Sequence, residues 1–161
     1  MTTQDFIKTY YNVDKYKFCA SVMVDGGKIY SYGKHYLLAV RIGTLDFVNK
    51  RPYSSTTQRH QSWARTALRE RGLDPINVYL SRDEADTIES LLWNGTTQAT
   101  IDAYSVVLKS LASEYKELSK KLDAKKRKDT QVYADLDAQR VRIGLDMDDV
   151  ANQQHELRAL L

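Results

Sequence analysis

Several features that would reveal the role of a protein are scarce in this chain of 161 residues. Cys19 is the only cysteine, which excludes an intramolecular disulfide and any zinc or iron–sulfur site built from several cysteines. No run approaches the roughly 18 apolar residues that a membrane-spanning helix needs, and the first residues lack a signal-peptide pattern. We therefore expect a protein of a reducing, cytoplasmic compartment.

A large excess of charge of one sign is also lacking. The chain carries 24 Lys and Arg against 21 Asp and Glu, a formal net charge of +3, so the whole molecule is not built to coat a polyanion. The last third is different, because its charges are segregated. Residues 109–128 contain 8 basic and 3 acidic residues (8 − 3 = +5), whereas residues 129–161 contain 3 basic and 7 acidic ones (3 − 7 = −4).

The first 95 residues have the pattern of a mixed domain. Apolar alternation and turn residues predict strands over 18–24, 28–32, 36–42, 45–48 and 76–80, the first four of them as a meander of three or four antiparallel strands. Capping residues predict helices over 58–71, ended by Gly72, and 81–93, ended by Asn94 and Gly95. Residues 3–11 fit either a short helix or a loosely held arm. We expect an α+β domain over 1–95, with a small antiparallel sheet and two helices.

Residues 96–161 repeat apolar side chains every seven positions from Ile101 to Leu160. Such a stripe requires a second helix to pack against, and the segregated charges favour an antiparallel one. A pairing centred near Arg127 joins residues 122 and 132, 118 and 136, and 111 and 143, and it also joins the two charged exceptions, Lys125 and Asp129. The predicted assembly residues are Leu108, Leu111, Tyr115, Leu118, Leu122, Lys125, Asp129, Val132, Leu136 and Ile143. A helical hairpin within one chain and an antiparallel homodimer give the same pairs, so both remain open.

The densest cluster of polar side chains lies in two runs, residues 30–36 and 56–62. The second run is a predicted helix N-terminus, which attracts anions through its free N–H groups and its dipole. We therefore predict a partner-binding face of Lys34, His35, Lys50, Arg51, Thr57, Arg59 and His60. The competing interpretation is that the hydroxyls only cap the helix and the charges are solvated.

Two further functions fit parts of this pattern. His35 and His60 would serve as the acid and base of a metal-independent nuclease, although nothing in the sequence places them in contact. Basic residues interleaved with tyrosines over 10–17 and 28–36 are typical of surfaces that bind nucleic acid directly. The alternative interpretation is that many of these tyrosines belong to the core. No acidic pair marks a metal site, and we expect no cofactor.

The run Tyr-Ser-Tyr-Gly-x-His-Tyr at 30–36 and the run Tyr-Ser-Ser-Thr-Thr-Gln-Arg-His-Gln-Ser at 53–62 resemble segments of small bacteriophage and prophage proteins. The resemblance lies within residues 30–62 and does not reach the heptad repeat. Small phage accessory proteins often bind and block host machinery, including CRISPR effectors. The resemblance therefore implies a non-enzymatic, anti-CRISPR-like binding protein in the cytoplasm of a host bacterium. Its partner would be a nucleoprotein or another nucleic-acid-handling complex.

Overall fold

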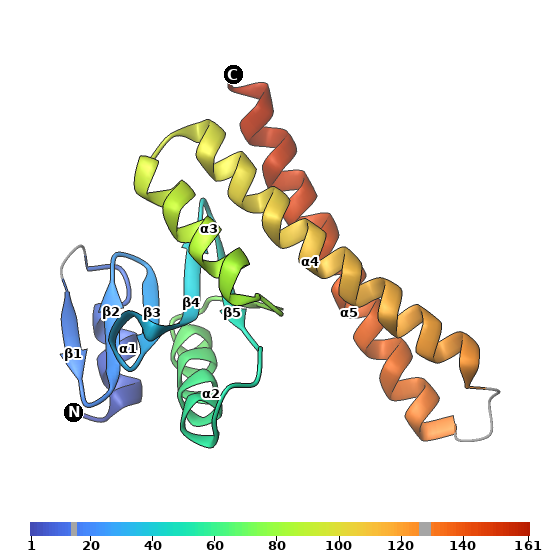
Figure 1. The fold of residues 1–161 in the computed structure, drawn as a ribbon, viewed down its shortest axis with the longest axis horizontal. Coiled ribbons are helices and arrows are strands. Elements are labelled where there is room, and N and C mark those ends of the chain that lie inside the picture. The colour runs from blue at the N-terminus through green and yellow to red at the C-terminus, as the bar shows by residue number, and fades with distance from the viewer. Residues whose placement is uncertain (14–15, 126–129) are drawn as a thin grey trace. The chain divides into compact units, whose positions relative to one another are not determined.

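The computed structural model describes residues 1–13, 16–125 and 130–161, and it is α+β (Figure 1). The chain divides into two compact units, residues 1–89 and 90–161. The boundary lies inside helix α3 (Arg82–Asn94), whereas the turn residues suggested a boundary after that helix.

A six-stranded sheet forms the centre of the first unit. Its strands are ordered as in the sequence: β1 (Lys17–Cys19), β2 (Val22–Asp25), β3 (Lys28–Ser31), β4 (Tyr36–Ile42), β5 (Leu45–Asn49) and β6 (Ile76–Val78). The first five strands form an antiparallel meander, one strand longer than the sequence suggested. Strand β6 pairs with β5 in parallel, because helix α2 (Ser55–Glu70) returns the chain between them.

The strand predicted over residues 18–24 is in fact two strands. The chain reverses at Ala20, whose φ of 52° is left-handed, so that Cys19 pairs with Val22. A second left-handed residue, Tyr32, lies beside this turn, and its N–H donates to the carbonyl of Ser21 at 2.6 Å. The sequence prediction was wrong here because this turn has none of the Gly or Asn residues that mark most hairpins.

Among the described residues of the first part, three segments form α-helices rather than the two expected. Within residues 3–11, Thr3–Tyr10 form helix α1, which begins with a reciprocal capping box between Thr2 and Asp5. Ser54 is the N-cap of helix α2, and its Oγ accepts the N–H of Thr57. The predicted capping box of α3 is confirmed, since the N–H of Ser81 donates to Glu84 and the N–H of Glu84 donates to Ser81 Oγ.

Helices α1 and α2 cover one face of the sheet. Their apolar side chains form one buried cluster with strands β2 to β5, which includes Phe6, Ile7, Tyr11, Val22, Val24, Ile29, Leu38, Val48, Ala64 and Leu68. The first turns of α3 contact the other face. Ile29 belongs to the cluster, whereas the next residue, Tyr30, donates a hydrogen bond to Glu89 of α3. Successive side chains of a strand point to opposite faces, so the helices lie on both sides of the sheet.

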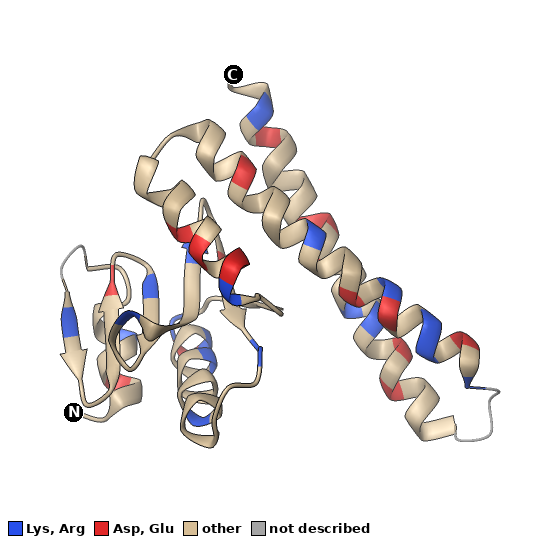
Figure 2. Ribbon diagram, in the orientation of Figure 1, with Lys and Arg blue, Asp and Glu red and all other residues tan. Residues whose placement is uncertain are grey.

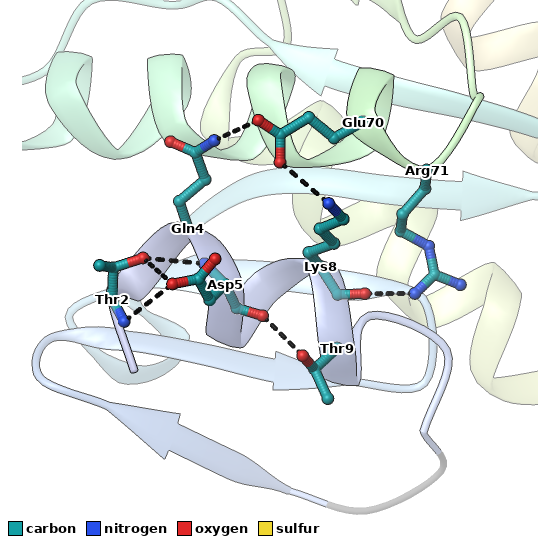
Figure 3. Close-up of polar contacts among 7 residues, drawn as sticks. All are labelled: Thr2, Gln4, Asp5, Lys8, Thr9, Glu70 and Arg71. Carbon is teal, nitrogen blue, oxygen red and sulfur yellow. Dashed lines mark hydrogen bonds and ion pairs between the residues drawn. The ribbon is translucent and has the colours of Figure 1, made fainter.

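Polar contacts at the surface fasten α1 to the end of α2 (Figure 3). The amide of Gln4 donates to Glu70 at 2.9 Å, and Lys8 Nζ lies 3.4 Å from the other oxygen of the same carboxylate. Arg71 donates to the backbone carbonyl of Lys8. These contacts hold the N-terminal segment in place as a helix, in agreement with the first of its two predicted forms.

The second unit contains the end of α3, helix α4 (Thr97–Ala124) and helix α5 (Thr130–Ala159). Gln154, near the end of α5, donates to the carbonyl of Ile101 at 2.9 Å and to Ser105 Oγ at 2.6 Å, both near the start of α4. Near the middle of the helices, a Cβ on Gly144 would lie 3.6 Å from the Tyr115 ring. The described residues Thr97–Ala124 and Thr130–Ala159 are helical, as the heptads predicted.

The predicted assembly residues have different environments in this unit. Buried positions include Leu111, Leu118, Leu122 and Ile143, and partly buried ones Leu108, Val132 and Leu136. Tyr115 is 38% exposed. Lys125 is exposed at the C-cap of α4 rather than in the apolar stripe, and its proposed partner Asp129 lies outside the described residues. Among the described residues, no helix is both long and apolar enough to cross a bilayer.

Candidate functional site

A groove in the first unit brings together three of the predicted partner-binding residues, Lys34, His35 and Arg51. Lys34 and His35 lie in the 3₁₀ turn η1 (Gly33–His35), immediately before β4, and Arg51 follows β5. Because β4 and β5 are antiparallel neighbours, the start of one and the end of the other meet at the same edge of the sheet. The first turns of α3 complete the groove with Arg82, Asp86 and Glu89.

Buried amide side chains fix the floor of this groove. Asn49 Oδ1 accepts the N–H groups of Arg51 and Leu80, both at 3.1 Å, and the Asn49 amide group donates to the Leu37 carbonyl at 3.2 Å. Gln61 of α2 donates to the carbonyls of Asn49 and Arg51 at 2.7 and 2.9 Å. The segment that carries Arg51 is therefore held from both sides, which positions its side chain.

The tyrosine Tyr36 completes the floor. Its hydroxyl donates to the carbonyl of Arg51 at 2.5 Å and lies 3.0 Å from the Gln61 amide nitrogen. Burial raises the pKa of Tyr36, so its hydroxyl keeps its proton and remains a donor near neutral pH. The guanidinium of Arg51 lies 5.7 Å from the centre of the Tyr36 ring, which holds the cation beside the groove.

Two further tyrosines position charged groups at the rim. Lys34 Nζ donates to Tyr16 Oη at 2.7 Å and lies 4.7 Å from the centre of the same ring. This hydrogen bond raises the pKa of Lys34, which stays protonated. On the α3 side, Tyr30 donates to Glu89, and burial followed by this bond raises the pKa of Tyr30. Lys34 and Glu89 are thus each held by the hydroxyl of a tyrosine, Tyr16 and Tyr30 respectively.

The groove is therefore mixed in charge. Lys34, Arg51 and Arg82 supply three cations beside His35, and Asp86 and Glu89 supply two carboxylates. Arg82 and Asp86 are exposed and 4.0 Å apart, a spacing at which solvent screens much of their attraction. A surface with both signs of charge over a rigid floor suits a protein partner that presents the complementary pattern.

The other predicted partner-binding residues lie elsewhere. Thr57 is buried and hydrogen-bonds Ser54 at the start of α2, as the capping interpretation had it. Arg59 is exposed on α2, and Lys50 is partly buried while its N–H donates to the carbonyl of Val78 at 2.9 Å. These three residues do not line the groove.

His60 is only 3% exposed, and its Nδ1 shares a hydrogen bond of 2.7 Å with Ser31 Oγ. The rings of Tyr32 and Trp63 flank it at centroid distances of 5.9 and 5.4 Å. Burial, and then the charge of Arg59, lower the pKa of His60 and favour its neutral form. His35 lines the groove and His60 does not, so this groove does not supply the paired histidines of the nuclease hypothesis.

Sequence reasoning missed the contribution of α3 to this site. None of the residues of this helix was among the predicted partner-binding residues. Arg82, Asp86 and Glu89 are spaced by four and three residues, which places them on one side of the helix. That spacing was the available signal, but only the packing of α3 on the sheet identifies the side that faces the groove.

Among the described residues, no group of three His, Cys, Asp or Glu side chains is placed to hold a metal ion. Cys19 is partly buried and packs against the cluster under α1 and α2. Comparison with protein-family models, curated proteins and solved structures finds no match for this chain.

Proposed function

We propose that this chain is a non-enzymatic, phage-type accessory protein that binds a host nucleoprotein or another nucleic-acid-handling complex, as an anti-CRISPR-like inhibitor would. The observation that carries this proposal is the groove. It gathers Lys34, His35 and Arg51 with Arg82 over a floor fixed by Asn49 and other buried polar groups. A preorganised charged surface binds a partner with little loss of side-chain entropy.

The phage origin and the host partner rest on the resemblance of residues 30–62, and the groove supplies the chemistry of the contact. Charged residues at a rim steer partners and reject those with the wrong charge pattern. Reversing the charge of two groove cations is therefore the sharpest test of the binding site. The double variant Arg51→Glu/Arg82→Glu changes the charge and leaves the backbone carbonyl of residue 51 available to Gln61.

The test is capture from a bacterial lysate by the full chain, followed by mass spectrometry, with and without prior nuclease treatment. We expect the wild-type chain to capture a defined nucleic-acid-handling complex and the double variant to lose it. The matched control Lys116→Glu/Lys120→Glu reverses two exposed charges on α4 and should retain the partner. Equal capture by both double variants would refute the role of the groove.

A turnover assay separates this function from the nuclease alternative. Purified chain incubated with single-stranded and duplex substrates should leave them intact. If cleavage occurs and the His35→Ala and His60→Ala variants abolish it, the protein is an enzyme and the present proposal is wrong.

We further propose that α4 and α5 pair as an antiparallel coiled coil within one chain. The contact of Gln154 with Ile101 and Ser105 supports this, because it joins the end of one helix to the start of the other. The same pairs would form between two chains in an exchanged dimer. Light scattering of the full chain distinguishes the two, since the hairpin gives a monomer mass of 18.5 kDa. A mass of twice that value supports the exchanged dimer.

A further inference from the structure

Helix α2 carries three arginines, and its one carboxylate, Glu70, is the last residue of the helix. Between Asp46 and Glu70 the chain contains five Lys and Arg residues and no Asp or Glu. Three of the five, Arg59, Arg65 and Arg69, lie on α2. Figure 2 colours Lys and Arg blue and Asp and Glu red along the chain. Glu70, the first acidic residue after them, is engaged by α1. Globular surfaces usually intersperse both signs of charge, so this helix is unusual.

The environments of the three arginines also indicate that their positive charge is largely uncompensated. Arg59 and Arg69 are exposed, and neither forms an ion pair in the part of the chain that the structure describes. Arg65 donates to the neutral amide oxygen of Asn77 at 2.8 Å. Burial, and then the charge of Arg69, lower the pKa of Arg65. The cations of α2 thus repel one another, and an external polyanion would relieve that repulsion.

The spacing of the exposed arginines fits an extended ligand. Arg59 and Arg69 are ten residues apart on one helix, or about 15 Å along its axis. Exposed polar side chains, among them Ser62 and Thr66, lie between them on the same side of α2. A single small anion cannot reach both cations, whereas a chain of phosphates can.

An exposed aromatic residue contacts α2 near the Arg59 end of the helix. Tyr32 is 44% exposed, and its ring lies 5.9 Å from the ring of the buried His60, the residue that follows Arg59. Tyr32 is held at φ 55° and ψ 56°, a left-handed conformation that bulky side chains rarely adopt. Glycine or asparagine would fit this backbone with less strain. Strained residues of this kind concentrate at functional sites.

We propose that the exposed side of α2, together with Tyr32, binds single-stranded nucleic acid. Arg59 and Arg69 contact the phosphates, and the ring of Tyr32 stacks on an unpaired base. Stacking on an aromatic side chain requires a base whose face is free, which a duplex does not offer. This surface shares no residue with the lining of the groove, so the inference goes beyond the proposed function and does not depend on it.

Fluorescence anisotropy with a labelled oligothymidine, measured over a series of salt concentrations, tests the phosphate contacts. We expect the double variant Arg59→Gln/Arg69→Gln to bind at least tenfold more weakly than the wild type. The slope of log affinity against log salt should fall by about 0.7 for each phosphate that the variant no longer neutralises. A duplex of the same length should bind more weakly than the single strand.

Variants of Tyr32 test the stacking contact separately. Tyr32→Phe keeps the ring and should retain affinity, whereas Tyr32→Asn removes the ring and should bind roughly tenfold more weakly, with an unchanged salt slope. Asparagine tolerates the left-handed conformation, so this variant should still fold. Circular dichroism and thermal unfolding of each variant confirm that weaker binding does not reflect unfolding.

Two matched variants locate the surface. Lys116→Gln/Lys120→Gln removes the same charge from α4, and Arg51→Gln/Arg82→Gln removes it from the groove; both should bind oligothymidine within about twofold of the wild type. The proposal is overturned if either weakens binding as much as Arg59→Gln/Arg69→Gln does. It is also overturned if oligothymidine does not bind, or if duplex DNA binds as tightly as the single strand.

Discussion

Arg41 and Asp46 face each other across the β4–β5 hairpin and form a two-point hydrogen-bonded ion pair. Arg41 Nε and Nη2 donate to the two oxygens of Asp46 at 2.9 and 2.8 Å. Asp46 is only 5% exposed, and the hydroxyl of Tyr11 donates to it at 2.8 Å. One carboxylate therefore ties the end of α1 to the hairpin at the centre of the sheet.

Replacing Asp46 by alanine should destabilise the protein by about 2–3 kcal/mol. The variant leaves the Arg41 guanidinium and the buried Tyr11 hydroxyl without their acceptor, and unmade hydrogen bonds of buried groups are costly. Urea unfolding monitored by circular dichroism measures the change. The control is Glu117→Ala, which breaks an exposed pair with Lys120 and should change stability by about 0.5 kcal/mol or less. Equal small effects would contradict the structural role of Asp46.

Gln61→Leu should cost about 2 kcal/mol of stability. Leucine has a similar size but cannot donate to the carbonyls of Asn49 and Arg51, which then remain unsatisfied under the groove. Gln58→Leu is the matched control, because Gln58 is exposed on the same helix. The difference in free energy of unfolding between the two variants checks this assignment. If both variants are as stable as the wild type, the buried amide does not fix the floor of the groove.

The buried His60 should make stability depend on pH. Its pKa in the folded protein is lowered by burial, whereas in the unfolded chain it is near 6.5. Below about pH 6.5 the unfolded state therefore takes up a proton that the folded state resists. The stability due to this group is complete above pH 6.5 and declines as the pH falls toward the folded-state pKa.

The measurement is the free energy of unfolding at pH 7.5 and at pH 5.5 for the wild type and two variants. His60→Gln should lose less stability than the wild type between the two pH values. His155→Gln removes an exposed histidine and should behave as the wild type does. An unchanged pH dependence in His60→Gln would show that this histidine does not titrate differently in the two states.

Leu111→Ala should destabilise the second unit by about 2–5 kcal/mol, because this side chain is fully buried. Leu145→Ala is the matched control on α5. Leu145 is 56% exposed, so the same truncation should change stability by less than about 1 kcal/mol. Thermal unfolding of both variants shows which of the two side chains is packed in the interior of the second unit. A larger loss for Leu145 would mean that the helices pack through the other side of α5.

Most of the elements were predictable from local signals. The strands over 36–42 and 45–48, the Gly72 end of α2 and the capping box of α3 all depend on residues within a few positions of one another. The turn at Ala20 was not predictable, because it uses a left-handed alanine between two apolar strands. Helix α1 was ambiguous because its contacts, such as that of Lys8 with Glu70, are distant in sequence.

The candidate site, too, was predictable from the sequence only in part. The sequence by itself determined the chemistry: the residue types near the sheet edge, the segment 47–69 without Asp or Glu, and the heptads of α4 and α5. Only the tertiary structure decided which of these residues share a surface. It buried His60 against Ser31 and brought Arg82 of α3 to Lys34 and Arg51. The physical reason is that burial and proximity depend on how helices pack on the two faces of a sheet, which residue type and spacing along the chain do not specify.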